Sequence, residues 1–193
     1  MRSPRNRSIV ICETRIARPV GAMPKKSPRW VRELRSPDQP DAIREGRVEL
    51  GIACLPVEGE LESRVLATES LVVALPSRHR LAKKARVEVA ELRDERFVIV
   101  RPDVEPAWAG AVSRALAKHG VGGAIAQETD TKIAMLGLVA AGLGVSVVSS
   151  SMRVLERRGV VMRPVIGVGV RLRIGVIARR ERSARAQAFV DAL

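Results

Sequence analysis

Apolar and polar residues follow short, regular patterns from Asp41 to the end of the chain. Val48–Leu55 carries an apolar side chain at every second position, which is typical of a strand with one buried face. The run Phe97–Val100 is continuously apolar and is stopped by Pro102, which is typical of a short buried strand. The pattern therefore predicts an ordered α/β body that begins near residue 41.

Strands and helices alternate between residues 97 and 148. We expect three strands and two helices in this segment: strands at 97–100, 124–127 and 145–148, and helices at 106–119 and 131–141. Gly120 and Gly142 follow the two helices as helix-ending residues, and Asp130 is the expected N-cap of the second. This β-α-β-α-β order predicts a parallel sheet covered by helices.

The remaining segments give a less regular pattern. We expect a helix end at Gly46, strands at 63–67, 70–75, 160–165 and 170–176, a single helical turn near 87–92, a helix capped by Ser151 that ends at Gly159, and a last amphipathic helix capped by Ser183. In residues 1–40, six prolines interrupt any long element. Only a short strand at 8–12 and a short helix at 27–34 are expected there, so 1–40 is predicted to be a poorly defined, basic, Pro-rich segment.

The positive charge lies at the two ends of the chain. The formal net charge is +13, of which residues 1–40 contribute +7, residues 41–150 contribute −1, and residues 151–193 contribute +7. A basic total invites a nucleic-acid interpretation. However, reading DNA needs an element that enters a groove, and no helix-turn-helix pattern is visible. We therefore interpret the charge as arginine-rich solvated surface.

Cysteine usage and hydropathy indicate the cellular compartment that we expect for the protein. Cys12 and Cys54, the two cysteines, have neither zinc-site spacing nor a disulfide framework. Reduced thiols indicate the cytoplasm. No apolar run is long enough to cross a membrane, so no membrane partner is expected.

Six short motifs occur in an order and spacing that resemble a known family. They are Gly46–Ile52, Glu69–Pro76, His79–Ala82, Leu92–Val98, Leu138–Val148 and Phe189–Leu193. With them, residues 42–193 resemble the effector-binding (substrate-binding) domain of LysR-type bacterial transcriptional regulators. The resemblance implies an α/β fold: a two-lobed, periplasmic-binding-protein-like (type 2) domain with crossing hinge strands. Lobe one would comprise 41–75 plus 149–193, and lobe two 76–148.

The chain departs from the family before Ala42. The family's N-terminal winged helix-turn-helix is not present, and residues 1–40 do not match the strand and helix that should open lobe one. We therefore expect an incomplete first lobe and a truncated form of the regulator. The abrupt change of pattern near Asp41 suggests a frameshifted or misannotated start. Reading the upstream DNA in all frames tests that hypothesis.

Candidate effector-binding residues follow the ends of predicted strands. Ligands of open α/β sheets bind at loops after the carboxyl ends of parallel strands, and helix N-termini there offer N–H groups to anions. The candidates are Leu55, Pro56, Arg101, Pro102, Thr129, Ser149 and Ser150. A carboxylate-bearing effector would suit an arginine with nearby hydroxyl groups. Thr129 is equally well explained as a helix cap, and Arg101 as a solvent-facing side chain.

The sequence predicts neither a catalytic residue, nor a metal site, nor a cofactor. His79 and His119 are interpreted as structural, and Gly142-Leu143-Gly144 is a helix-to-strand turn rather than a dinucleotide fingerprint. We therefore expect a small-molecule effector-sensing domain that forms a homodimer, with no specific DNA binding by this chain alone. The alternatives are a stand-alone basic nucleic-acid-binding protein and, less favoured, an enzyme on a similar two-lobed fold.

Overall fold

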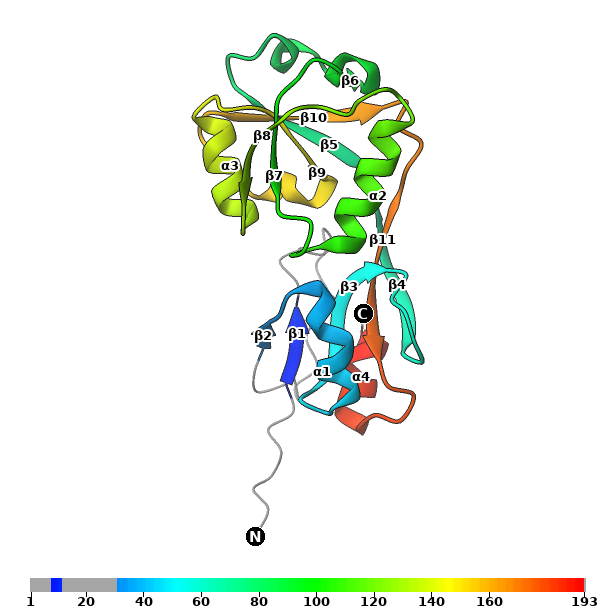
Figure 1. The fold of residues 1–193 in the computed structure, drawn as a ribbon. Coiled ribbons are helices and arrows are strands. Elements are labelled where there is room, and N and C mark those ends of the chain that lie inside the picture. The colour runs from blue at the N-terminus through cyan, green and yellow to red at the C-terminus, as the bar shows by residue number, and fades with distance from the viewer. Residues whose placement is uncertain (1–7, 12–30, 193) are drawn as a thin grey trace. The chain divides into compact units, whose positions relative to one another are not determined.

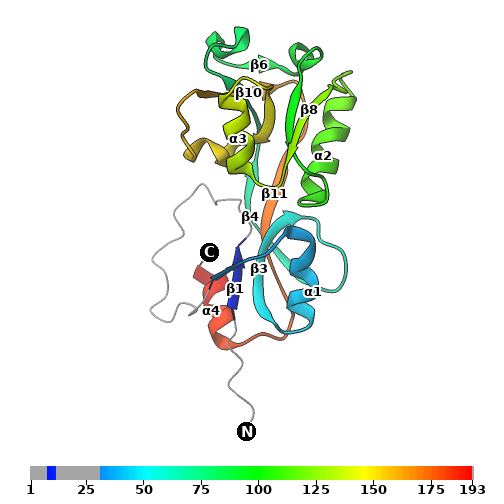
Figure 2. The same ribbon diagram turned by 60° about the vertical axis from the view of Figure 1, so that its left-hand side comes forward.

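A computed structural model describes residues 8–11 and 31–192, drawn in Figure 1 and, after a 60° turn, in Figure 2. The chain forms two compact units. The first unit comprises residues up to Thr68 and residues from Arg173 onward, and the second is Glu69–Leu172. The chain enters the second unit at the end of β4 (Glu62–Glu69) and leaves it at the start of β11 (Leu172–Ala178).

These bounds differ from the lobes expected from the sequence. The segments 69–75 and 149–172, which the sequence-based division assigned to lobe one, pack in the second unit. The reason is strand pairing. β5 (Leu71–Pro76) is antiparallel to both β9 (Ser146–Ser149) and β10 (Val160–Ile166), so its hydrogen bonds hold all three strands in one sheet.

The first unit is a five-stranded sheet with the order β2-β1-β3-β11-β4. β1 (Ser8–Ile11) is parallel to β2 (Val31–Glu33) and to β3 (Val48–Leu55), whereas β11 is antiparallel to β3. Two helices, α1 (Gln39–Arg44) and α4 (Ala184–Ala192), pack against residues of the sheet. The predicted helix end at Gly46 is confirmed, since its φ of 72° is left-handed.

β3 is buried on both faces, although its alternating pattern predicted one. Leu50 packs with Phe189 of α4, while Ala53 packs with Ile43 of α1. The smaller side chains of the second face, Ala53 and Gly51 among them, let a helix approach closely. An ideal Cβ at Gly51 would lie 2.5 Å from the Gln39 side chain and 3.2 Å from Ile43.

The second unit contains the predicted β-α-β-α-β segment. Its elements are β7 (Phe97–Val100), α2 (Pro106–Ala117), β8 (Ile125–Thr129), α3 (Lys132–Ala140) and β9. β7 is parallel to β8, and a parallel bridge from Phe97 to Val145 joins β7 to the start of β9. The prediction of parallel strands covered by helices is confirmed, and α2 and α3 lie on either side of these strands (Figure 1).

A second, four-stranded sheet follows, in which β5 is antiparallel to β9 and β10 and the short β6 (Val87–Glu88) is parallel to β10. Its strand order is β6-β10-β5-β9. Among the described residues, four 3-10 helices connect or flank the regular elements: Ser36–Asp38, Arg80–Lys83, Val89–Leu92 and Ser150–Val154. The expected helical turn near 87–92 corresponds to β6 and the 3-10 helix that follows it.

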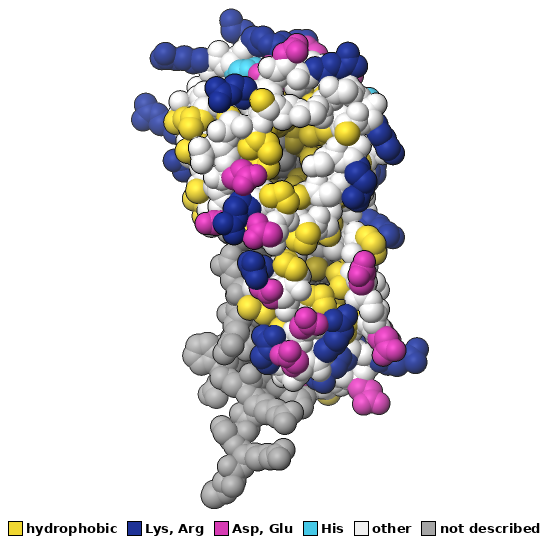
Figure 3. Space-filling view, in the orientation of Figure 1, with side chains coloured by type: hydrophobic (Ala, Val, Ile, Leu, Met, Phe, Trp, Pro, Cys, Tyr) yellow, Lys and Arg dark blue, Asp and Glu magenta, His cyan; other side chains and the backbone are white. Residues whose placement is uncertain are grey.

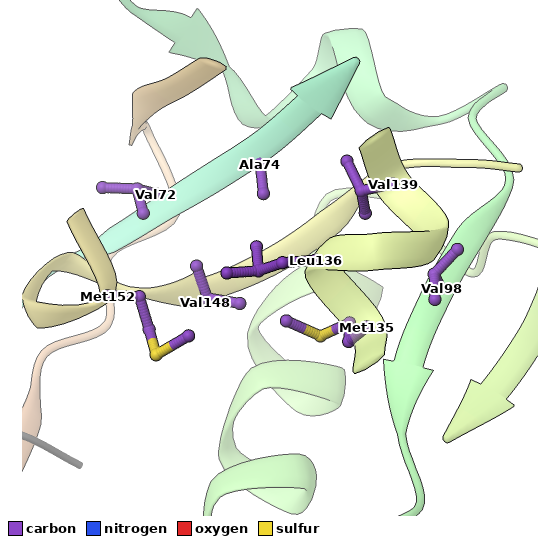
Figure 4. Packing of buried hydrophobic residues seen from close by; sticks show 8 residues of the cluster. All are labelled: Val72, Ala74, Val98, Met135, Leu136, Val139, Val148 and Met152. Atoms are coloured by element: carbon purple, nitrogen blue, oxygen red, sulfur yellow. The ribbon is translucent and has the colours of Figure 1, made fainter. Parts of the chain in front are cut away.

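Side chains of α3 cover one face of the strands in the second unit. Met135, Leu136 and Val139 are at most 2% exposed and pack on Val98 and Val148. Figure 4 shows Leu136 and Val139 directed at the strands, with Val72, Ala74 and Met152 completing the cluster. Each large apolar side chain buried in this way contributes about 1.5–3 kcal/mol.

Three local predictions need correction. Thr131 is the N-cap of α3, because its hydroxyl accepts the Ala134 N–H at 3.1 Å, whereas Asp130 lies one residue earlier and is exposed. Ser151 does not cap a helix that ends at Gly159; it is buried within a short 3-10 helix. Val31–Glu33 is a strand that pairs with β1, where a helix was expected.

Other predictions of this kind fall partly outside the described residues. Residues 27–30 of the expected helix and Cys12 lie there, so the two reduced thiols stay a prediction. The cap at Ser183 is confirmed, since its hydroxyl accepts the Ala186 N–H at 3.2 Å at the start of α4.

Candidate functional site

Three parallel strands of the second unit end at one edge of the sheet. Arg101 follows β7, Thr129 ends β8, and Ser149 ends β9. The Arg101 N–H donates to the Thr129 carbonyl at 2.9 Å, so the first two of these residues are in direct contact. This is the edge where open α/β sheets bind ligands.

Arg101 is held by two carboxylates at this edge. Its Nε lies 3.2 Å from Oδ1 of Asp103 and 3.3 Å from Oδ1 of Asp130, and its Nη2 lies 3.1 Å from Oδ2 of Asp103. The side chain is 48% exposed. Water therefore screens these pairs, and a ligand carboxylate could replace one of them at modest cost.

The Thr129 hydroxyl closes the turn before α3. It accepts the Thr131 N–H at 3.0 Å and donates to the Thr131 carbonyl at 2.8 Å. These two bonds fix the approach to the helix, whose cap is Thr131 itself. Thr129 thus has a local structural role beside any role in ligand binding.

The two serines after β9 face different partners. The Ser149 hydroxyl is buried and lies 2.9 Å from that of Ser151, which donates to Oε2 of Glu69 at 2.8 Å. The Ser150 N–H donates to the Ser70 carbonyl at 2.9 Å. Oε1 of Glu69 is buried and has no hydrogen-bond partner among the residues that the structure describes. This buried carboxylate was not singled out from the sequence.

Leu55 and Pro56 belong to the other compact unit. Leu55 ends β3 and is buried, and Pro56 follows it at an exposed position. The structure therefore brings Arg101 and Thr129 into contact in the second unit and places Ser149 and Ser150 on the adjacent strand end. The remaining two candidates lie in the first unit.

A pocket of about 320 Å³ lies beneath α2 in the second unit. Its walls are mainly apolar and come from α2, β7 and β9, and Arg101 and Pro102 also line it. Figure 3 shows hydrophobic side chains gathered beside α2, where the surface is hollowed. Ligand sites typically span about 300–1,000 Å³ with a few polar groups among apolar walls, so the pocket has the size of a binding site.

A buried ion pair lines the same pocket. Nζ of Lys132 lies 2.8 Å from Oε1 of Glu105, and both side chains are about nine-tenths buried. Lys132 opens α3 and Glu105 stands at the N-cap of α2, so the pair joins the starts of the two helices. Sequence reasoning missed both residues. The available signal was that Lys132 is the sole charged residue of an otherwise apolar helix.

The described ranges of the chain are 8–11 and 31–192. They hold no group of three His, Cys, Asp or Glu side chains placed to bind a metal ion. Nor do they include a helix with the length and apolarity needed to cross a membrane. His79 has a structural role: its Nδ1 accepts the Leu81 N–H at 3.3 Å, and its Nε2 lies 3.1 Å from Oε2 of Glu95.

Comparison with known proteins identifies the family. Residues 30–193 match the LysR substrate binding domain, so the match begins twelve residues before the resemblance drawn from the motifs. The chain is 28% identical over 126 residues to the regulator CatR of Pseudomonas putida, and 31% identical over 125 residues to the uncharacterized regulator YnfL of Escherichia coli K12. These alignments cover 65% and 63% of this chain, but 43% and 41% of the relatives. The chain thus spans less than half of each regulator.

Solved structures of this family share the fold. Full-length CbnR in complex with its target DNA superposes with a TM-score of 0.82 at 19% identity, covering 96% of this chain and 68% of that one. The BenM effector binding domain, solved with its effector benzoate, superposes with a TM-score of 0.78 at 22% identity, covering 96% and 89%. The predicted periplasmic-binding-protein-like (type 2) α/β fold is confirmed. With the family matched over residues 30–193, this chain belongs to the LysR substrate binding domain family.

Proposed function

We propose that this chain is the effector-sensing domain of a LysR-type transcription regulator, and that it binds a small carboxylate-bearing molecule. The observation that carries the proposal is the family match over residues 30–193. The BenM domain of the same fold was solved with a carboxylate, benzoate. The relatives are named as transcriptional regulators, which supports a sensing role rather than an enzymatic one.

The effector is proposed to bind where β7, β8 and β9 end, with Arg101 as the group that receives its carboxylate. The ion pairs of Arg101 use Nε and Nη2, so Nη1 can donate to a ligand oxygen. Pro102, Thr129, Ser149 and Ser150 would complete this edge. A bidentate guanidinium–carboxylate contact gives both orientation and affinity.

The first test is a thermal-shift screen against small aromatic and aliphatic acids that includes benzoate. A ligand that binds only the folded state raises the melting temperature. With the best acid in hand, Arg101→Gln should raise its dissociation constant about tenfold to 150-fold, because a hydrogen bond to a charged group contributes about 1.5–3 kcal/mol. Arg114→Gln, on the exposed side of α2, is the control and should leave affinity unchanged. Equal losses in the two variants would refute the role of Arg101.

The hydroxyl groups are tested by Ser149→Ala and Thr129→Ala. If these side chains touch the effector, each variant loses affinity by a similar factor while the fold persists. If Thr129 serves only the turn before α3, the melting temperature falls and the affinity of the folded protein does not change. If Ser149 serves only the Ser151–Glu69 network, its variant loses stability alone. Calorimetric titration together with thermal denaturation separates these outcomes.

We also propose that the chain forms a homodimer, with α3 as one contact surface. Ile133 on α3 is 64% exposed, the highest value among the large apolar side chains of the described residues. Ile133→Glu should shift the protein to a monomer in light scattering, while Val154→Glu, at a second exposed apolar position, should not. A concentration-independent monomer for the unmodified chain would contradict the proposal.

Two further properties of the chain remain predictions. A cytoplasmic location and the lack of specific DNA binding by this chain alone both follow from its interpretation as a sensing domain. A footprint on a defined DNA sequence that persists at physiological salt would contradict the second, because nonspecific binding through basic residues weakens steeply as salt rises.

A further inference from the structure

We infer that the pocket beneath α2 is a second ligand site, which takes a compact, apolar, uncharged molecule that carries one hydroxyl or carbonyl group. This goes beyond the proposed function, because the ligand differs in charge from the carboxylate proposed for the edge of the sheet. The inference rests on the volume of the pocket, on its apolar walls and on three buried polar side chains that line it.

The pocket is larger than the voids that close packing usually leaves in a protein interior. Native interiors contain few voids larger than a water molecule. An apolar cavity of about 150 Å³ binds benzene, and this pocket has about 320 Å³. A molecule with two fused six-membered rings therefore fits, whereas a long flexible chain would lose more conformational entropy on entering.

The walls of the pocket are made by opposite elements with apolar side chains. Val112 and Leu116 of α2 line one side, and Phe97 and Ile99 of β7 line the other, with Val147 of β9 beside them. Two aromatic side chains line the pocket: Phe97 from the sheet side and Trp108 from α2. Aromatic rings pack against one another in offset or edge-to-face arrangements, so an aromatic ligand between Phe97 and Trp108 has favourable partners.

The ion pair sets the charge of the buried part of the pocket. Arg101, which also lines the pocket, is 48% exposed and is paired with Asp103 and Asp130. Lys132 and Glu105 are 2.8 Å apart and together carry no net charge. A ligand hydroxyl can join this pair, accepting from the ammonium group and donating to the carboxylate. A ligand carboxylate would lose its hydration and would also lie close to the negative charge of Glu105, which raises the cost of burying it.

Ser146 provides another polar contact. It is 1% exposed, lines the pocket, and donates to the sulfur of Met135 at 2.9 Å. A thioether is a weak hydrogen-bond acceptor. An oxygen atom of a ligand is a stronger one, so a bound hydroxyl or carbonyl group would satisfy a buried donor that the protein itself satisfies poorly.

The direct experiment uses three ligands with the same rings: 2-naphthol, naphthalene and 2-naphthoate. Binding to the full chain is measured by ligand-observed NMR titration. Within this pocket, measured as the binding that Ala109→Phe removes, we expect 2-naphthol to bind at least tenfold more tightly than 2-naphthoate, with naphthalene between them. Ser146→Ala should weaken 2-naphthol several-fold and leave naphthalene unchanged, because only the former can accept from the serine. Tighter binding of 2-naphthoate than of 2-naphthol within this pocket would overturn the inference.

Two matched substitutions on α2 locate the bound ligand. Ala109→Phe fills the pocket and should lower affinity for 2-naphthol more than tenfold, whereas Ala107→Phe, at an exposed position outside the pocket, should not change it. If Ala109→Phe does not fold, as judged by circular dichroism, Val112→Ile replaces it with an expected several-fold loss. Unchanged affinity in the folded pocket variant would overturn the inference. Because 2-naphthol and naphthalene carry no carboxylate, failure of their binding leaves the proposed carboxylate site open to its own screen.

Discussion

The two helices of the second unit cover the same strands in different ways. On the face covered by α3, Met135, Leu136 and Val139 are almost completely buried against Val98 and Val148. On the face covered by α2, a pocket of about 320 Å³ remains between helix and strands. The α3 side is therefore a closed core, apart from Met135 and Val148, which also border the pocket, and the α2 side is hollow, although both are built from similar apolar residues.

The difference begins at alternate residues of one strand. Val98 of β7 lies in the α3 cluster, while Phe97 and Ile99 on either side of it line the pocket. Adjacent strand residues point to opposite faces, so a four-residue strand serves both purposes. We conclude that stability is concentrated on the α3 face, and that the α2 face gives up packing contacts and provides space for a ligand.

The largest effect is expected where the two faces meet, at the buried pair Lys132–Glu105. Lys132→Met removes the cation that lies 2.8 Å from the buried Glu105 carboxylate and should reduce the free energy of unfolding by about 3–5 kcal/mol. The double variant with Glu105→Leu should recover most of this loss, because no uncompensated charge is left. Urea denaturation measures all three proteins. A double variant as unstable as the single one would show that the helices need the pair itself.

A matched pair of leucines compares the faces directly. Leu136→Ala in the closed core should cost toward the upper end of the range of about 2–5 kcal/mol for such changes, because a new cavity forms. Leu116→Ala on α2 should cost toward the lower end, because that side chain already borders open space. Equal losses by chemical denaturation would mean that the α2 face closes in solution, which would break the comparison.

Much of the closed face was predictable from local pattern. The strand Phe97–Val100 was placed at its observed bounds, and the parallel β-α-β-α-β order followed from short apolar runs between helical segments. Neighbouring residues dictate such elements, so a single sequence contains the information. The cap of α3 was misplaced by one residue because Asp130 and Thr131 are both good caps and local sequence does not choose between them.

The hollow face was not predictable in the same way. Glu105 and Lys132 are 27 positions apart, and nothing in either local sequence indicates that they pair. The pocket itself depends on the distance between α2 and β7, which is set by packing of side chains from separate elements. Ser149 and Thr129 were identified as hydroxyls near strand ends, but their bonds to Ser151 and Thr131 required three-dimensional placement.

A smaller effect on stability is expected at the N-terminal ends of α2 and α3, which differ in their capping. The hydroxyl of Thr131 caps α3, whereas Glu105 at the corresponding position of α2 makes no side-chain cap hydrogen bond. Thr131→Ala should therefore cost about 1 kcal/mol. Thr131→Ser keeps the hydroxyl and should retain most of the stability in thermal denaturation. If serine is as damaging as alanine, the threonine methyl group rather than the cap is what matters.

The smallest effect is expected at a surface ion pair remote from both faces, and it provides the reference for the buried one. A hydrogen bond from Lys84 holds the pKa of Glu91 below its ordinary value of 4.5. Because the folded-state pKa is lowered, the stabilisation is fully present above about pH 4.5 and is lost as the pH falls through the lowered folded-state value. Glu91→Gln removes the charge but retains an oxygen that can accept the Glu88 N–H, which Glu91 accepts at 3.2 Å. Urea denaturation between pH 3 and pH 7 should therefore show the native chain slightly more stable than the variant at neutral pH, with the difference vanishing in acid. A difference that persists unchanged at the lowest pH would mean that the side chain acts through its backbone hydrogen bond and not through its charge.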